Sequence, residues 1–178
     1  MMTIKEKEKK AFDVLKTKFG YKNKMQSPRL EKVVISAGIG SIKDKNKIEL
    51  VADRLGKITG QKVAPTVAKK SIASFKVREG DKVGYVVTLR GKMMHDFLER
   101  FLNIALPRTK DFRGISKKSL DEIGNYTLAI KEHTIFPETS NEEIKDVFSF
   151  AITVVTSAKT KAEAGEFLSA LGFPFKKD

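Results

Sequence analysis

The sequence predicts an α+β fold in one compact domain, with helices packed on one face of a mostly antiparallel sheet. Helical and strand-like patterns intermix along the 178 residues, and several helical segments carry a single apolar stripe. Such a stripe packs against one face of a sheet, which leaves the other face or the sheet edges open to a partner. A chain of this length suits one well-buried domain better than two.

The first two helices are expected in the N-terminal third of the chain. Residues 4–19 place Phe12, Leu15 and Phe19 on one face, and the Ser27-Pro28 pair is expected to stop this segment. Whether the first twenty residues are ordered without a partner is left open. A second helix is expected over residues 46–59, and Gly60 suits its C-terminal cap. Its apolar stripe consists of Ile48, Val51, Leu55 and Ile58.

Two further helices are expected after residue 90. Gly91 opens the third, which Pro107 ends, and His95 falls on its polar side as a solvent-facing residue. The apolar stripe of this helix consists of Met94, Phe97, Leu98, Phe101 and Ala105.

For the fourth helix, Thr160 and Glu163 have the spacing of a capping box, and Gly172 caps its end before Pro174. Its apolar stripe consists of Ala164, Phe167, Leu168 and Leu171.

Five segments have strand-like patterns. They are residues 30–37, 62–68, 82–90, 125–131 and 148–157. In the third of these, Thr88 and Arg90 point to one face while Tyr85, Val87 and Leu89 point to the other. His133, just after the fourth strand, is expected at an ordinary half-exposed position, although its ring could also stack on a base.

Charge is the first indication of function. The chain has 35 basic and 22 acidic side chains, which gives a formal net charge of +13. Residues 1–118 contain 29 basic and 12 acidic side chains, whereas residues 119–178 contain 6 and 10. Concentrated on one part of a fold, such a surplus attracts polyanions; spread evenly, it would indicate only a solvated, lysine-rich surface.

Composition argues against several classes of protein. The sequence has no cysteine and only two distant histidines, His95 and His133, so we expect no disulfide, no metal and no cofactor. No apolar run approaches the roughly 20 residues that cross a bilayer, and the charged first ten residues do not resemble a signal peptide. We therefore expect no membrane partner, and a location in the cytosol or inside an organelle.

No motif indicates catalysis or a small-molecule substrate. Gly38-Ile39-Gly40 suggests a dinucleotide fingerprint, but position 43 is Lys where the third glycine is required. The sequence has no nucleophile elbow and no paired carboxylates in a plausible catalytic setting. An enzyme acting on nucleic acid is one rival hypothesis, but it would need a metal site or an acid–base pair that the sequence does not show. An architectural DNA-binding protein that uses the same charge without specificity is the other.

The stretch from Gln61 to Lys92 carries the strongest pattern for nucleic-acid binding. It contains 8 basic and 2 acidic residues, and cations alternate with the aromatic ring of Phe75. Cations bind phosphates and release counterions, while an exposed ring can stack on a base or ribose. The alternative is that Phe75 belongs to the core and the lysines are solvated. The basic side chains around Phe75 are Lys69, Lys70, Lys76 and Arg78.

A second basic loop is expected at residues 107–118, after the third helix. With one aromatic ring and three cations it could touch RNA or an acidic partner, or be a solvated connector. Its cations are Arg108, Lys110 and Arg113.

The order of short motifs along the chain resembles a known family. The runs are PRLEKVVIS, TGQK, AKKSIASFKVREG, VTLRG, FLNIALPR, DFRG, GNYTLAIKE and IFPE, with LSALGFPF near the end. Together they resemble the bacterial-type 5S-rRNA-binding protein of the large ribosomal subunit, conventionally numbered five. The resemblance covers residues 20–175, and it is the succession of motifs that makes it specific.

This resemblance implies a structural, non-enzymatic role in translation. Family members bind 5S rRNA, help to seat it in the central protuberance beside 23S rRNA, touch the P-site tRNA and contact the head of the small subunit. The basic loop at residues 69–80 would approach the tRNA, and the loop at residues 107–114 would face the small-subunit head protein. The family's RNA-contact positions correspond here to Ser36, Gln61, Phe75, Thr88 and Arg90.

Four places depart from the family pattern. The family usually has Asn where this chain has Ser36. The Ser hydroxyl reaches less far than the Asn side-chain amide and offers fewer hydrogen-bonding groups. A direct RNA contact at this position would therefore be lost or mediated by water. Glu122-Ile123-Gly124 stands where Gly-Arg-Gly is common, which removes one cation. His95 and His133 stand where Tyr and Gln are usual.

Overall fold

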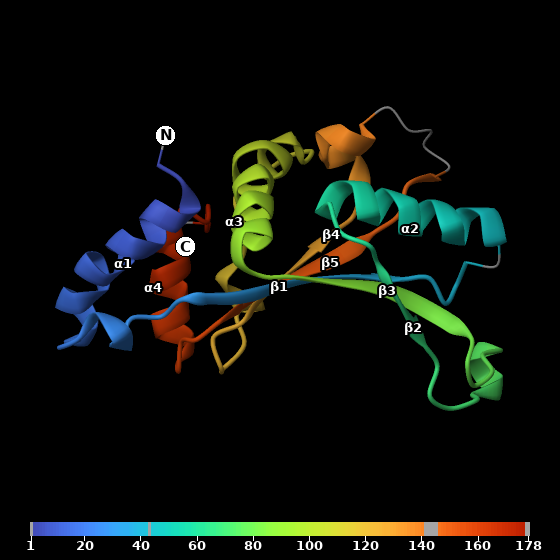
Figure 1. The fold of residues 1–178 in the computed structure, drawn as a ribbon, viewed down its shortest axis with the longest axis horizontal. Coiled ribbons are helices and arrows are strands. Elements are labelled where there is room, and N and C mark those ends of the chain that lie inside the picture. The colour runs from blue at the N-terminus through green and yellow to red at the C-terminus, as the bar shows by residue number, and fades with distance from the viewer. Residues whose placement is uncertain (1, 43, 141–145, 177–178) are drawn as a thin grey trace. The chain divides into compact units, whose positions relative to one another are not determined.

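A computed structural model describes residues 2–42, 44–140 and 146–176 of the chain. It has an α+β fold with a five-stranded antiparallel sheet, as the sequence predicts (Figure 1). The strands lie in the order β2-β3-β1-β5-β4. Their bounds are β1 Leu30–Gly38, β2 Ala64–Val67, β3 Lys82–Leu89, β4 Tyr126–Ile130 and β5 Phe150–Thr156.

The described residues group into two compact units. The first comprises Met1–Val33, Leu89–Leu128 and Thr153–Asp178; the second comprises Val34–Thr88 and Ala129–Ile152. The longer helices of the first unit are α1 Ile4–Phe19, α3 Gly91–Arg100 and α4 Lys161–Leu171, and that of the second is α2 Lys45–Thr59. The helices α1, α2 and α4 begin and end close to the positions that the sequence indicates.

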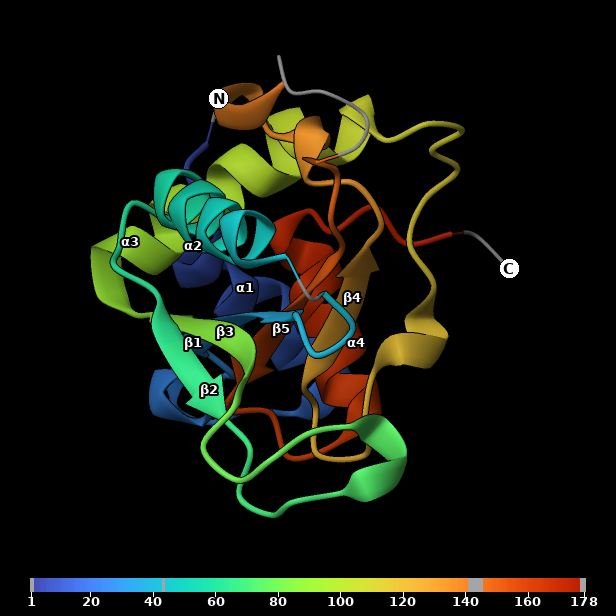
Figure 2. The same ribbon diagram turned by 90° about the vertical axis from the view of Figure 1, so that its right-hand side faces the viewer.

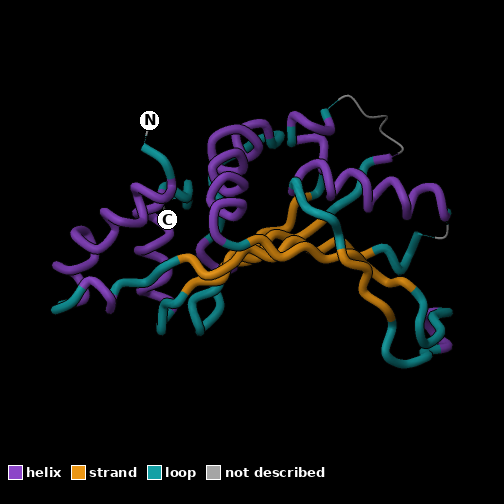
Figure 3. The backbone as a smooth tube through the Cα atoms, viewed as in Figure 1, coloured by secondary structure: helices purple, strands orange, loops and turns teal. Residues whose placement is uncertain are grey.

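In the second unit, α2 covers one face of the sheet (Figures 1 and 3). Val51, Leu55 and Ile58 of the predicted stripe are fully buried, and Ile48 is half-buried. Gly60 caps the helix in the left-handed conformation, with φ of 69°, as predicted. Among the described residues of this unit, no helix covers the opposite face, which therefore stays open to a partner (Figure 3).

In the first unit, α1 packs against α4 and α3 (Figure 1). All four residues of the predicted α4 stripe are buried, and Gly172 caps this helix with φ of 99°. Only half of the expected capping box forms. Thr160 accepts from the Glu163 amide, but the Glu163 carboxylate accepts from the amide of Lys159 instead of that of Thr160.

The prediction for α1 is right in extent but wrong in two details. The helix ends at Gly20, which is left-handed with φ of 68°, and not at the Ser27-Pro28 pair. Leu15 is buried as expected, but Ile4 and Ala11 complete the buried face, while Phe19 remains 36% exposed. The buried face of α1 is the one that contacts α4 and α3. The spacing of large side chains within α1 alone does not predict which face this is.

The helical run after Gly91 changes form before Pro107. Regular α-helix ends at Arg100, a π-helical turn spans Phe101–Ala105, and a 3₁₀ turn spans Leu106–Arg108. Proline cannot donate a backbone hydrogen bond, so the helix widens and then tightens around it. All five residues of the predicted stripe are nevertheless buried.

Both histidines differ from the expectation. His95 is half-buried: its Nε2 lies 3.0 Å from a Glu8 carboxylate oxygen, and its Nδ1 lies 2.7 Å from the Gly91 carbonyl oxygen. His133 is fully buried and stacks on Phe148, with ring centroids 4.2 Å apart. Its Nδ1 accepts from the Phe148 amide at 3.4 Å, so this ring is part of the core and cannot stack on a base.

Candidate nucleic-acid interface

The open face of the sheet in the second unit presents a row of polar and small side chains. On β1, Ser36 is exposed between buried Ile35 and Ala37. On β3, Thr88 is exposed and Val87 is buried. Within the described residues, neither hydroxyl makes a hydrogen bond, so both are available to a partner that lies along this face.

Gln61 is brought to the same place from a distant part of the sequence. It follows the Gly60 cap of α2, and its side-chain amide donates to the carbonyl oxygen of Thr88 at 3.4 Å. Its backbone amide donates to the buried hydroxyl of Thr59, also at 3.4 Å, which anchors the turn. Two of the expected contact residues are thus adjacent in the fold.

A long basic loop connects β2 and β3. We define it as residues 68–81; Figure 2 shows it extending on the side of the sheet away from α2. The expected cations Lys69, Lys70, Lys76 and Arg78 are all exposed, and within the described residues none of them forms an ion pair with a carboxylate. Their charge is therefore not neutralised inside the protein.

Phe75 lies on the surface of this loop and not in the core. Its side chain is 74% exposed, on the short turn Ala73–Phe75. It borders a hollow of about 920 Å³ whose apolar wall includes Ile72, Val77 and Val83. An exposed ring beside an apolar hollow, surrounded by cations, can stack on an unpaired base while lysines hold the adjacent phosphates.

Gly84 shapes this face and was not among the residues that the sequence singled out. A Cβ atom at this position would lie 2.7 Å from the Thr66 hydroxyl oxygen on β2 and 2.9 Å from the Ala37 carbonyl oxygen on β1. The absence of a side chain thus lets three strands lie close together beneath the open face. A lone glycine inside a strand pattern was the available signal.

We expect Gly84→Ala to lower the free energy of unfolding by about 1–3 kcal/mol, because the added methyl group meets rigid backbone. Denaturant unfolding of the intact chain measures the change. Gly38→Ala is the matched control, because a Cβ atom added to Gly38 on β1 would meet no atom within 4 Å and its φ lies outside the left-handed range. Equal stability of the two variants would contradict this account of Gly84.

The remaining expected contact residues belong to the first unit. Arg90 directly follows β3, is exposed, and precedes α3 without capping it through its side chain. Arg108, Lys110 and Arg113 are exposed on the loop after the 3₁₀ turn. Asp111 in this loop adopts a left-handed conformation with φ of 52°, so the loop makes a sharp turn there.

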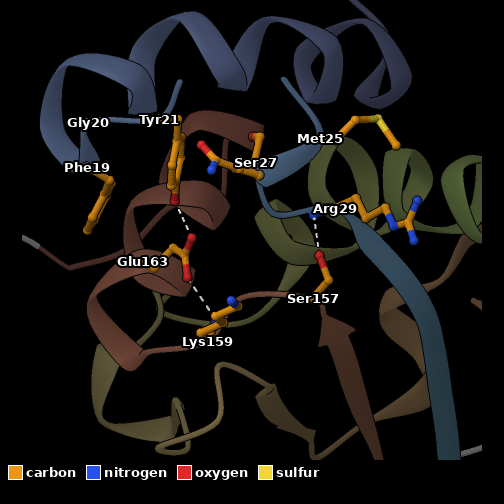
Figure 4. Close-up of a pocket in the computed structure, with 10 residues that line it drawn as sticks. Phe19, Gly20, Tyr21, Met25, Ser27, Arg29, Ser157, Lys159 and Glu163 are labelled. Carbon is orange, nitrogen blue, oxygen red and sulfur yellow. Dashed lines mark hydrogen bonds between the residues drawn. The ribbon is translucent and has the colours of Figure 1, made fainter. Parts of the chain in front are cut away.

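A polar hollow of about 550 Å³ also lies in the first unit (Figure 4). The Tyr21 hydroxyl donates to the Glu163 carboxylate, which also accepts from the amide of Lys159 at 2.8 Å. The Arg29 amide donates to the Ser157 hydroxyl at 2.9 Å. Because these groups bond to one another, they connect α1 and β1 to the C-terminal part of the chain.

Tyr21 should make stability fall at alkaline pH. Burial, the hydrogen bond to Glu163 and the charge of that carboxylate raise the pKa of Tyr21 above its usual value. The protonated hydroxyl therefore adds stability that is complete below about pH 10, where an unfolded tyrosine titrates, and is lost as pH rises toward the folded pKa. Tyr21→Phe should lose about 1 kcal/mol at neutral pH and show a weaker alkaline decline.

Thermal unfolding between neutral pH and pH 11 tests this expectation. Phe19→Leu is the control, since Phe19 stacks on Tyr21, with ring centroids 5.9 Å apart, and has no titratable group. That variant keeps the Tyr21 hydroxyl and its hydrogen bond to Glu163, so it should keep the alkaline decline. An unchanged alkaline slope in Tyr21→Phe would assign the decline to another group, such as Tyr126, whose pKa burial raises to about 12.

The described residues offer neither a metal site nor a membrane-spanning helix. Among the described residues, no group of three or more His, Cys, Asp or Glu side chains is placed to hold a metal ion. In the same residues, no helix combines the length and the apolarity needed to span a bilayer.

Comparison with protein families gives two adjoining matches. Residues 23–78 match the family model described as "Ribosomal protein L5", and residues 82–175 match the model that describes the C-terminus of the same ribosomal family. The gap between the matches, residues 79–81, lies at the end of the basic loop, so the two matches contain the strands of the open face and most of that loop.

Three curated proteins similar to this chain share the name "Large ribosomal subunit protein uL5". The relative from Heliobacterium modesticaldum is 49% identical over 176 residues, which is 97% of this chain and 98% of the relative. The relative from Magnetococcus marinus is 51% identical over 164 residues, covering 92% and 89% of the two chains. That from Halothermothrix orenii is 48% identical over 164 residues, covering 92% of each.

Proposed function

Because the chain belongs to the ribosomal protein L5 family, whose members are structural proteins of the large ribosomal subunit and not enzymes, we propose that it binds 5S rRNA. In this role it helps to attach 5S rRNA to the central protuberance and contacts 23S rRNA. It also contacts the P-site tRNA and a protein of the small-subunit head. Both units serve one RNA-binding domain of 178 residues.

The observation that carries this proposal is the open face of the second unit. Ser36 and Thr88 offer unpaired hydroxyls there, and Gln61 adds a side-chain amide that is held by the carbonyl oxygen of Thr88. No helix of the second unit's described residues covers this face of the sheet. Groups of this kind suit 2′-hydroxyls and the base edges of unpaired nucleotides. The short reach of the Ser36 hydroxyl favours a contact through water at that position.

Affinity comes mainly from the cations, as is usual for RNA-binding proteins. Lys69, Lys70, Lys76 and Arg78 of the basic loop hold phosphates of RNA, including those of the tRNA, and Arg90 adds a guanidinium that can form paired hydrogen bonds with one phosphate. Arg108, Lys110 and Arg113 face the small subunit or neighbouring rRNA.

Binding to a 5S rRNA transcript at about 150 mM salt tests the proposal, with tRNA and duplex DNA in excess as competitors. We expect tight binding that survives both competitors, because the exposed hydroxyls, amide and ring recognise folded RNA. Binding that either competitor abolishes would favour the rival hypothesis of a protein that binds nucleic acid by charge without specificity.

A further inference from the structure

The basic loop is ordered by bonds within itself. All six backbone amides from Lys76 to Asp81 donate to acceptors inside the loop. Ile72 and Val77 exchange both backbone hydrogen bonds, of 3.0 and 3.3 Å, close to the tip. At the base, the amide of Ala68 donates to the Asp81 carbonyl oxygen at 2.9 Å, and the amide of Gly80 donates to the Ala68 carbonyl oxygen at 3.0 Å.

Between tip and base, two side chains replace the missing backbone acceptors. The Asp81 carboxylate accepts from the amide of Arg78 at 2.7 Å, and the Ser71 hydroxyl accepts from the amide of Glu79 at 2.9 Å. The short distance to Asp81 is typical of a charge-assisted hydrogen bond. Without these side chains, the two amides would have only solvent as a partner, and the middle of the loop would lose its constraints.

The constrained loop holds its contact groups in one arrangement. Lys76, which follows Phe75, adopts a left-handed conformation with φ of 52°, which is unfavourable for a residue with a side chain. Backbone hydrogen bonds on both sides of the turn keep it there, and so fix the direction in which the Phe75 side chain leaves the backbone. The entropy cost of ordering the loop then falls on folding and does not weaken binding.

We propose that Ser71 and Asp81 are positioning residues that hold the basic loop in its RNA-binding form before RNA arrives. This inference rests on the proposed function, and it assigns neither residue a contact with RNA. It also explains why a carboxylate stands in a loop that binds phosphates. The negative charge of Asp81 by itself opposes RNA binding, so its positioning role and its charge act in opposite directions.

That opposition gives a sharp test with a matched control. Asp81→Ala and Glu79→Ala each remove one exposed carboxylate from the same loop, but within the described residues the Glu79 side chain bonds to nothing. By charge alone, both variants should bind 5S rRNA slightly more tightly. We expect the affinity of Glu79→Ala for 5S rRNA to rise by up to about twofold. We expect the affinity of Asp81→Ala to fall about tenfold, which is close to the free energy of one hydrogen bond to a charged group.

Ser71 provides an independent check without a change of charge. Ser71→Ala should bind about threefold more weakly, and Ser71→Thr, which keeps the hydroxyl, should restore the affinity. Because both hydrogen bonds belong to the folded state, Asp81→Ala and Ser71→Ala should lower the free energy of unfolding slightly, whereas Glu79→Ala and Ser71→Thr should leave it unchanged. Hydrogen exchange of the Arg78 amide in the free protein should accelerate in Asp81→Ala but not in Glu79→Ala.

The outcomes separate this inference from the proposed function. If the unaltered chain fails to bind 5S rRNA specifically, the proposed function is overturned and the inference with it. If the unaltered chain binds but Asp81→Ala matches or exceeds Glu79→Ala in affinity, the inference alone is overturned. Rapid exchange of the Arg78 and Glu79 amides in the unaltered protein would overturn it as well, because the loop would then not be ordered in advance.

Discussion

Replacing Arg90 by alanine should weaken binding of 5S rRNA by about 1.5–3 kcal/mol, the scale of a hydrogen bond to a charged group. The side chain is exposed, and within the described residues it forms no ion pair or hydrogen bond. Its removal should therefore leave the free energy of unfolding nearly unchanged. Titration of labelled 5S rRNA measures the affinity, and denaturant unfolding of the same protein measures the stability.

Arg90→Lys distinguishes a paired guanidinium contact from charge alone. Lysine keeps the cation but cannot form two parallel hydrogen bonds with one phosphate. We expect its affinity to lie between those of the unaltered chain and Arg90→Ala, with the salt dependence of the unaltered chain. A loss below a few tenths of a kcal/mol in the alanine variant would remove Arg90 from the interface.

Phe75→Leu should weaken RNA binding by about 1–3 kcal/mol, the range measured for stacking of one base on an aromatic ring. Leucine keeps an apolar side chain beside the hollow but has no ring. Because Phe75 is 74% exposed, we expect no change in the melting temperature. The affinity for 5S rRNA and for tRNA should be measured separately, since this loop is proposed to reach the tRNA.

Phe75→Tyr is the matched control for stacking. Tyrosine retains the ring, and the exposed position leaves room for a hydroxyl, so the affinity should stay close to that of the unaltered chain. If Phe75→Leu instead loses stability but keeps normal RNA affinity, Phe75 serves packing and not stacking, which is the alternative that the sequence left open.

Local sequence patterns predicted most of the helices and strands, because these elements are stabilised largely by interactions between residues close in sequence. The stripe of α4 and the glycines that cap α2 and α4 lie where spacing and residue type indicate. The buried face of α1 and the burial of His133 could not be predicted in this way. Both depend on partners far along the chain: α4 and α3 for the helix, and Phe148 for the ring.

The candidate interface shows the same division. The alternation of side chains along one strand was enough to predict that Thr88 is exposed on β3 and that Arg90, directly after the strand, is exposed as well. The hydrogen bond from Gln61 to Thr88 joins residues 27 positions apart, and the close approach of Thr66 and Ala37 at Gly84 involves three strands. Periodicity carries no information about such distant neighbours, so the sequence indicated the types of contact residue but not their arrangement.

Ultraviolet crosslinking of the intact chain to 5S rRNA, followed by identification of the attached peptides, tests whether the open face and the basic loop bind RNA. We expect crosslinks in peptides that contain the basic loop at residues 68–81, with Phe75 as the main site, and in peptides from β3 to Arg90. Peptides from α4 should remain free. Crosslinks confined to α4, with none in the basic loop, would contradict the assignment of RNA binding to the second unit's open face and loop.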